Sequence, residues 1–120
     1  MRIFIADDNS DVRRGVAGIL SSHPTWEVCG EAANGAEAIL KVTDMLPDVV
    51  LLDISMPGIS GLEVAQVLRQ KVSNVKIVVM SQYDPALLLP RAREAGALAC
   101  IDKGRLAADL IPTIERISQG

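Results

Sequence analysis

The chain has 120 residues, a length that suits one domain with a single hydrophobic core. Apolar residues make up 49% of it and aromatic residues only 2%, so the core must be built mainly from aliphatic side chains. A net charge of −3 argues against broad attraction to nucleic acid or to an anionic membrane. The sequence shows neither an apolar run of about 20 residues nor a signal peptide, and we expect a cytoplasmic protein without membrane contact.

Five short apolar runs alternate along the chain with longer segments of helical period. The runs are residues 3–6, 26–32, 49–53, 75–80 and 98–101. Three of them are continuous rather than alternating, which is typical of strands buried on both faces of a parallel sheet.

The segments between the runs carry apolar residues at helical spacing. These residues are Val12, Val16, Ile19 and Leu20 in the first helix; Ile39, Val42 and Leu46 in the second; Val64, Val67 and Leu68 in the third; and Leu110, Ile114 and Ile117 in the fifth. Helix starts are indicated by a capping box at Asn34 with Glu37, and by Asp84 before Pro85. Two prolines, Pro90 and Pro112, fall inside predicted helices, so we expect the fourth helix to be bent or short and the fifth to start late or kink.

This alternation predicts one α/β domain over residues 1–120, a (βα)5 doubly wound parallel sheet with helices on both faces. In such sheets ligands bind beyond the carboxyl ends of the strands. Polar residues follow four of the five predicted strands at that edge. They are Asp7 and Asp8 after the first, Asp53 at the end of the third, Ser81 after the fourth and Lys103 after the fifth.

The three carboxylates pose an electrostatic problem if the first and third strands are neighbours. Two such charges 4 Å apart repel by roughly 4 kcal/mol at an effective dielectric constant near 20. Either the carboxyl groups keep their protons or a cation is bound, and hard oxygen ligands, several of them charged, suit Mg²⁺. The alternative is that Asp8 or Asn9 merely caps the first helix; the convergence of Asp53, Ser81 and Lys103 on the same edge favours a site.

A carboxylate beside Mg²⁺ can act as a nucleophile on phosphorus, and Asp53 is the best placed to do so. Lys103 would then supply a cation to the phosphoryl group and the Ser81 hydroxyl could donate to one of its oxygens. The set of residues, rather than any one of them, predicts phosphoryl transfer to an aspartate.

Four blocks of the sequence resemble the receiver domain of two-component response regulators. They are IADDNSDVRRG, VVLLDISMPGISGLEVAQVLR, VKIVVMSQYD and GALACIDKG, and the resemblance extends over essentially the whole chain. It implies the flavodoxin-like strand order 2-1-3-4-5, with Asp53 as phosphoacceptor and Ser81 and Lys103 sensing the phosphoryl group. It further implies a Mg²⁺ site formed by Asp7, Asp8, Asp53 and the backbone carbonyl of Ser55.

The same resemblance implies the partners. GEAANGAEAI and SGLEVAQVLR are most similar to receivers joined to LuxR-type helix-turn-helix domains. A sensor histidine kinase would be the phosphodonor, and the fourth helix, fifth strand and fifth helix would form a possible homodimer surface. We expect no output domain within these 120 residues, and no direct nucleic-acid binding by this acidic chain.

Two departures from the family keep an alternative function open. Cys100 stands where an aromatic switch residue is usual, and Gln82 stands where a small residue is common. This alternative is a receiver-like interaction module that works without phosphorylation, and the complete set of Asp7, Asp8, Asp53, Ser81 and Lys103 argues against it. A small phosphohydrolase with an aspartyl intermediate is a second alternative, but its usual D-x-D after the first strand is absent. We therefore expect a signalling switch, which is not an enzyme but assists its own phosphorylation and dephosphorylation.

The strand order also bears on the two cysteines. Cys29 and Cys100 would lie on opposite edge strands, about four spacings of 4.8 Å apart. This separation exceeds the roughly 7 Å limit between the Cα atoms of a disulfide, so both should be free thiols.

Overall fold

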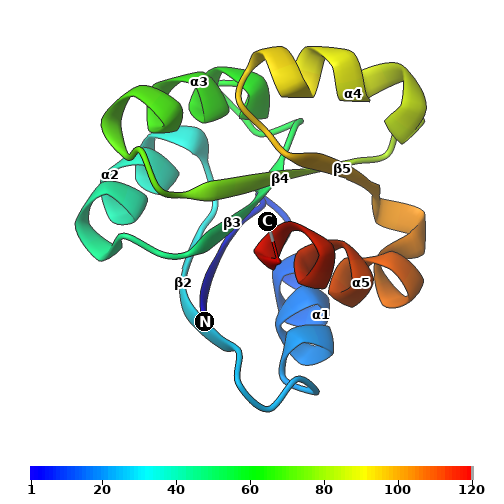
Figure 1. Cartoon of the computed structure of the whole chain (residues 1–120). Coiled ribbons are helices and arrows are strands. Elements are labelled where there is room, and N and C mark those ends of the chain that lie inside the picture. The colour runs from blue at the N-terminus through cyan, green and yellow to red at the C-terminus, as the bar shows by residue number, and fades with distance from the viewer. Residues whose placement is uncertain (120) are drawn as a thin grey trace.

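A computed structural model describes residues 1–119 of the chain (Figure 1). Strands and helices alternate throughout. In chain order they are β1 (Arg2–Ala6), α1 (Ser10–Leu20), β2 (Glu27–Ala32), α2 (Gly35–Met45), β3 (Val49–Asp53), α3 (Gly61–Lys71), β4 (Lys76–Ser81), α4 (Pro85–Glu94), β5 (Ala99–Asp102), the 3₁₀ turn η1 (Lys103–Arg105) and α5 (Leu106–Ser118). The alternation read from the sequence is therefore confirmed.

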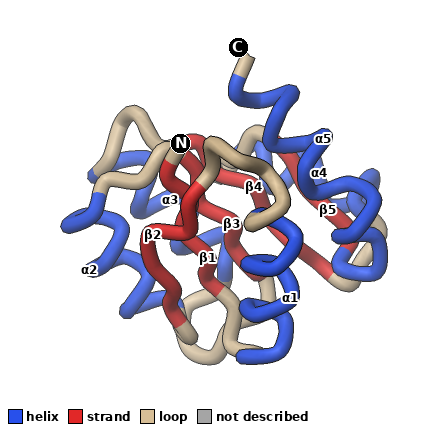
Figure 2. The backbone as a smooth tube through the Cα atoms, turned by 90° about the horizontal axis from the view of Figure 1, so that it is seen from below, coloured by secondary structure: helices blue, strands red, loops and turns tan. Residues whose placement is uncertain are grey.

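The five strands form one parallel sheet in the order β2-β1-β3-β4-β5. Helices α2, α3 and α4 cover one face, while α1 and α5 cover the other (Figure 1). Figure 2 shows the strands between α2 on one side and α1 on the other. This is the predicted flavodoxin-like, doubly wound fold with strand order 2-1-3-4-5.

Each face of the sheet has its own apolar layer, because successive side chains of a strand point to opposite faces. On β3, Val50 and Leu52 pack toward α2, α3 and α4, whereas Val49 and Leu51 pack toward α1 and α5. All five residues of β3 are buried. A strand covered on both sides explains the continuous apolar run in the sequence, and it gives the strand end at Asp53 a rigid support.

Four strands have bounds that differ from those predicted from the apolar pattern, and the first of them, β1, begins one residue earlier, at Arg2. β4 and β5 each begin and end one residue later than predicted, so Ser81 and Asp102 are the last residues of their strands. β2 begins at Glu27 because Trp26 stacks on His23 in the preceding loop, with ring centroids 3.8 Å apart. Polar residues at strand ends are not detected by an apolar pattern, although their backbones still pair with the neighbouring strand.

Side-chain caps fix the helix starts as the sequence predicted. The Asn34 side chain accepts a hydrogen bond from the Glu37 N–H at 2.9 Å, and the Glu37 carboxylate accepts one from the Ala33 N–H at 3.1 Å. The Asp84 carboxylate accepts from the Ala86 N–H at 2.9 Å, with Pro85 as the first helical residue. These bonds satisfy amide groups that have no partner within the helix.

The two helical prolines have a smaller effect than expected. α4 is the shortest of the five α-helices at 10 residues, yet it continues through Pro90. α5 begins at Leu106, well before Pro112, and also continues. Both prolines are exposed, so the carbonyl groups that lose an amide donor face solvent, and water can satisfy them.

Cys29 lies on β2 and Cys100 on β5, at the two edges of the sheet, and both are free thiols, as predicted. Within residues 1–119 no helix combines the length and the apolar character that crossing a bilayer requires.

Candidate functional site

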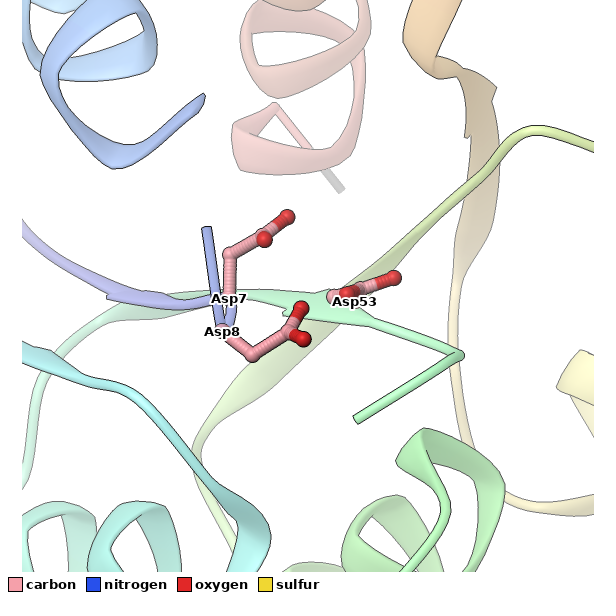
Figure 3. Close-up of side chains that lie close together, drawn as sticks. All are labelled: Asp7, Asp8 and Asp53. Carbon is pink, nitrogen blue, oxygen red and sulfur yellow. The ribbon is translucent and has the colours of Figure 1, made fainter. Parts of the chain in front are cut away.

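The predicted site residues gather at the carboxyl edge of the sheet. Asp7 directly follows β1, and Asp53 is the last residue of the adjacent strand β3. One carboxylate oxygen from each of Asp7, Asp8 and Asp53 lies within 4.8 Å of the others (Figure 3). The two neighbouring parallel strands thus bring together carboxylates that are 46 positions apart in the chain.

Asp7 is fully buried and is held on three sides. Its backbone N–H donates to the carbonyl of Ala32 at 3.0 Å, and its Oδ1 accepts the N–H of Asn9 at 2.9 Å. Its Oδ2 forms an ion pair with the Lys103 Nζ at 2.8 Å. Lys103 is the only side chain that contacts this buried oxygen among residues 1–119, so Oδ2 depends on one cation for its compensation.

Lys103 lies between two carboxylates, because its Nζ is also 3.1 Å from Oδ1 of Asp53. Burial disfavours the charged ammonium, but contacts with Asp7 and Asp53 outweigh this effect, and the pKa of Lys103 is raised above its ordinary value. The lysine therefore stays charged and compensates part of the negative charge of the cluster.

Asp53 is buried, and its Oδ1 also accepts the N–H of Ser55 at 3.0 Å. Burial raises the pKa of Asp53, and the charge of Asp7 raises it further. The Ser55 amide and Lys103 act in the opposite direction but do not cancel the rise. The ionised form of Asp53 is therefore disfavoured even with Lys103 beside it, and a further cation at this position would stabilise it.

Asp8 differs from the other two carboxylates because it is exposed. The N-cap of α1 is Asn9, whose side chain accepts the N–H groups of Asp11 and Val12 at 2.8 and 3.3 Å. Capping is therefore done by Asn9, and the Asp8 carboxylate points toward Asp53 instead (Figure 3). Capping and cluster formation thus belong to different residues of the same turn.

Ser81 is fully buried at the end of β4, the strand next to β3. Its Oγ accepts the N–H of Tyr83 at 2.9 Å, which orders the turn that leads into α4. Tyr83 itself is 69% exposed, as expected for a loop tyrosine. The hydroxyl hydrogen of Ser81 remains free to donate to another group.

The end of β3 is held against the start of α3 by a close backbone approach. A Cβ atom at Gly61 would lie 2.7 Å from the Cα of Ile54 and closer still to the carbonyl oxygen of Asp53. The Gly61 N–H donates to the Ile54 carbonyl at 3.0 Å. Glycine is needed at residue 61 for space, whereas at Gly58 a φ of 81° requires it for conformation.

The chemistry of the cluster fits a hard divalent cation. Three carboxylates lie within 4.8 Å of one another, and among residues 1–119 Lys103 is the one cation that pairs with them. Mg²⁺ prefers oxygen ligands and uses one or two carboxylates while keeping several waters. Asp7, Asp8 and Asp53 are the residues that could hold it.

The sequence did not indicate two contacts at this edge. Lys103 was expected to meet only a phosphoryl group, yet it pairs directly with Asp7 and Asp53. Arg13, on α1, donates to the carbonyl of Asp7 at 2.6 Å. An arginine one turn into a helix is usually solvated, so no sequence signal distinguishes it from Arg14.

Comparison with known proteins gives a consistent result. The chain matches the family described as "Response regulator receiver domain" over residues 3–115. It is 35% identical to "Transcriptional regulatory protein LiaR" of Bacillus subtilis over 121 aligned residues, covering 100% of this chain and 57% of LiaR. The chain spans little more than half the length of the curated relatives that it matches.

Two solved structures share the fold closely. A two-component response regulator of the LuxR family from Aurantimonas superposes with a TM-score of 0.91 at 31% identity, covering 97% of this chain and 83% of that one. The signal receiver domain of the putative response regulator NarL from Mycobacterium tuberculosis gives a TM-score of 0.91 at 30% identity, covering 99% and 96%.

Proposed function

The chain belongs to the response regulator receiver domain family, and on that premise we propose that it is a phosphoryl-accepting switch with Asp53 as acceptor. It is a signalling module of two-component systems, with LuxR-type relatives. The phosphodonor that we propose is a phosphohistidine of a partner sensor kinase.

One observation carries this proposal: three carboxylates, two of them buried, and Lys103 converge at the carboxyl edge of the sheet. Asp53 has the position of a nucleophile, because it ends a fully buried strand and its Oδ1 is fixed by Ser55 and Lys103. The second oxygen of Asp53, Oδ2, is therefore the one that we expect to attack phosphorus.

The transfer itself is a substitution at phosphorus. A bond forms between the Asp53 oxygen and phosphorus, the bond from phosphorus to the donor histidine nitrogen breaks, and its electron pair returns to the imidazole. Mg²⁺, when held by Asp7, Asp8, Asp53 and the carbonyl of Ser55, would neutralise charge on the phosphoryl oxygens. Lys103 can exchange its contact with Asp53 for a phosphoryl oxygen, and Ser81 can donate its free hydroxyl hydrogen to another.

These two residues couple the site to the surface that we propose for output. Ser81 ends β4 and precedes α4, while Lys103 follows β5 and precedes α5. Movement of both toward a phosphoryl group would shift the starts of α4 and α5. We propose that this surface, with β5 between the helices, supports a homodimer and controls transcription through a DNA-binding domain, in keeping with the LuxR-type relatives.

The test is phosphorylation by a small-molecule phosphodonor, followed by intact mass spectrometry with and without Mg²⁺. We expect one added phosphoryl group that requires Mg²⁺ and is lost in Asp53→Asn. The matched control is Asp84→Asn, a change of the same kind at an exposed N-cap where asparagine caps equally well. Labelling of Asp53→Asn at the wild-type level would contradict the assignment, and absence of labelling in the wild type would favour an interaction module that works without phosphorylation.

A further inference from the structure

Arg13 joins three elements at the edge of the site. It lies in the first turns of α1 and is largely buried, with 20% of its side chain exposed. Its Nη1 donates to the backbone carbonyl of Asp7 at 2.6 Å, and its Nε pairs with the carboxylate of Glu31 on β2 at 3.1 Å. The guanidinium is thus held at two atoms against the end of β1.

The carbonyl that Arg13 holds has a special position in the chain. It belongs to the peptide group that links Asp7 to Asp8, and a peptide group is planar, so fixing its oxygen fixes the direction in which Asp8 leaves the strand. The N–H of Asp7 is already bonded to Ala32, and its Oδ1 to the Asn9 N–H. Asp8 is exposed, and its side chain makes no hydrogen bond or ion pair among the described residues, so its orientation depends on this backbone.

We propose that Arg13 is a positioning residue for the Mg²⁺ site, acting by orienting the peptide group between Asp7 and Asp8. The inference rests on the metal site of the proposed function. Arg13 contacts neither the metal position nor Asp53 by the contacts described; it acts through the backbone of the two acidic residues. Residues of this kind behind metal ligands change metal affinity by about 10-fold or more when replaced.

The effect of removing Arg13 on Mg²⁺ affinity distinguishes a positioning role from a simple effect of charge, because the two predict changes in opposite directions. Arg13 is a cation close to the acidic cluster, so on charge alone its removal should strengthen Mg²⁺ binding. If Arg13 orients the ligands, its removal should weaken binding despite the gain in negative charge. Arg14, the next residue, provides the control, since it is 81% exposed and within residues 1–119 its one ion pair is with Asp11 at 3.6 Å.

The experiment is a calorimetric Mg²⁺ titration of the full chain without any phosphodonor. The variants are Arg13→Met, which keeps the aliphatic stem, Arg13→Lys, which keeps the charge, and Arg14→Met, which removes the same charge one residue away. We expect about 10-fold weaker binding in Arg13→Met, an intermediate loss in Arg13→Lys, and unchanged or slightly tighter binding in Arg14→Met. Thermal unfolding without Mg²⁺ shows that each variant is folded.

Wild-type or tighter Mg²⁺ affinity in Arg13→Met would overturn the proposal, and so would equal losses in Arg13→Met and Arg14→Met. A variant Arg13→Met that fails to fold leaves Arg13→Lys to decide, because the lysine variant must still bind Mg²⁺ more weakly than the wild type. These outcomes concern metal affinity alone. Failure of the proposed function would appear instead as normal Mg²⁺ binding without phosphorylation of Asp53.

Discussion

Replacement of Lys103 by methionine should destabilise the protein strongly when Mg²⁺ is absent. Lys103 forms ion pairs at 2.8 Å with Asp7 and at 3.1 Å with Asp53. The two carboxylates are 0% and 2% exposed, so bulk solvent is a poor substitute for the lost ammonium group. Methionine keeps much of the length of the side chain and removes only its charge and its donors.

Two independent estimates of the free energy of unfolding lost in Lys103→Met agree. Two carboxylate charges within 4.8 Å of each other repel by at least about 3.5 kcal/mol at an effective dielectric constant near 20. Removing one partner from a buried ion pair typically costs about 3–5 kcal/mol. For a chain of 120 residues, the entropy of unfolding converts each kcal/mol into about 4 °C of Tm, so we expect a fall of roughly 12–20 °C.

The assay is thermal and urea unfolding followed by circular dichroism, with a chelator present and then with Mg²⁺ added. The matched control is Lys71→Met at the exposed end of α3, where the lysine makes no ion pair among the described residues. We expect the control to lose less than about 1 kcal/mol, which is the range for a cation at a helix C-terminus. Mg²⁺ should restore much of the stability of Lys103→Met, since a divalent cation can replace the missing charge.

The loss of stability in Lys103→Met should also depend on pH. The pKa of Asp53 is raised by burial and by Asp7, so between its ordinary and its raised value the folded protein binds more protons than the unfolded chain. Stability without metal is therefore lost as pH rises through the raised pKa. Without Lys103 the pKa of Asp53 rises further, and the deficit of Lys103→Met should be smaller at about pH 5 than at about pH 8.

The reasoning is refuted if Lys103→Met unfolds like Lys71→Met in the presence of chelator, or if its deficit is larger at the lower pH. Either result would mean that Asp7 and Asp53 are not paired with Lys103 in solution.

Two further predictions concern the acidic turn and the support of Asp53. Asp8→Ala should weaken Mg²⁺ binding by at least about 10-fold in a calorimetric titration, because it removes a charged ligand, and should leave metal-free stability unchanged or raised; wild-type affinity would count against Asp8 as a ligand. Gly61→Ala should cost about 1–3 kcal/mol in urea unfolding, because its Cβ would press on the backbone of Asp53 and Ile54. Gly18→Ala, which introduces a Cβ with nothing within 4 Å, should instead be stabilising, and equal effects of the two changes would refute the close approach.

The sequence alone determined the fold class and most of the elements. The apolar run that became β3 was located with both of its bounds, and β1 was located to within one residue, because both strands are buried on two faces and leave a continuous apolar run in the sequence. The caps at Asn34 and Asp84 were predicted for a similar reason, since capping involves residues only two to four positions apart. The predicted strand ends were wrong at Trp26, which stacks on His23 outside β2, and at Ser81, which belongs to β4 because it pairs with Asp102 on β5.

Some features of the candidate site could likewise be predicted from the sequence, whereas others are visible only in the tertiary structure. Its acidic members could be found from the sequence, because parallel strands place their carboxyl ends at one edge and polar residues follow the apolar runs there. The pairing of Lys103 with both Asp7 and Asp53 depends on distances between strand ends that are far apart in the chain. Arg13 and Arg14 show the limit most clearly. They are adjacent and chemically identical, but the direction in which α1 packs against the sheet puts one guanidinium on the Asp7 carbonyl and leaves the other in solvent.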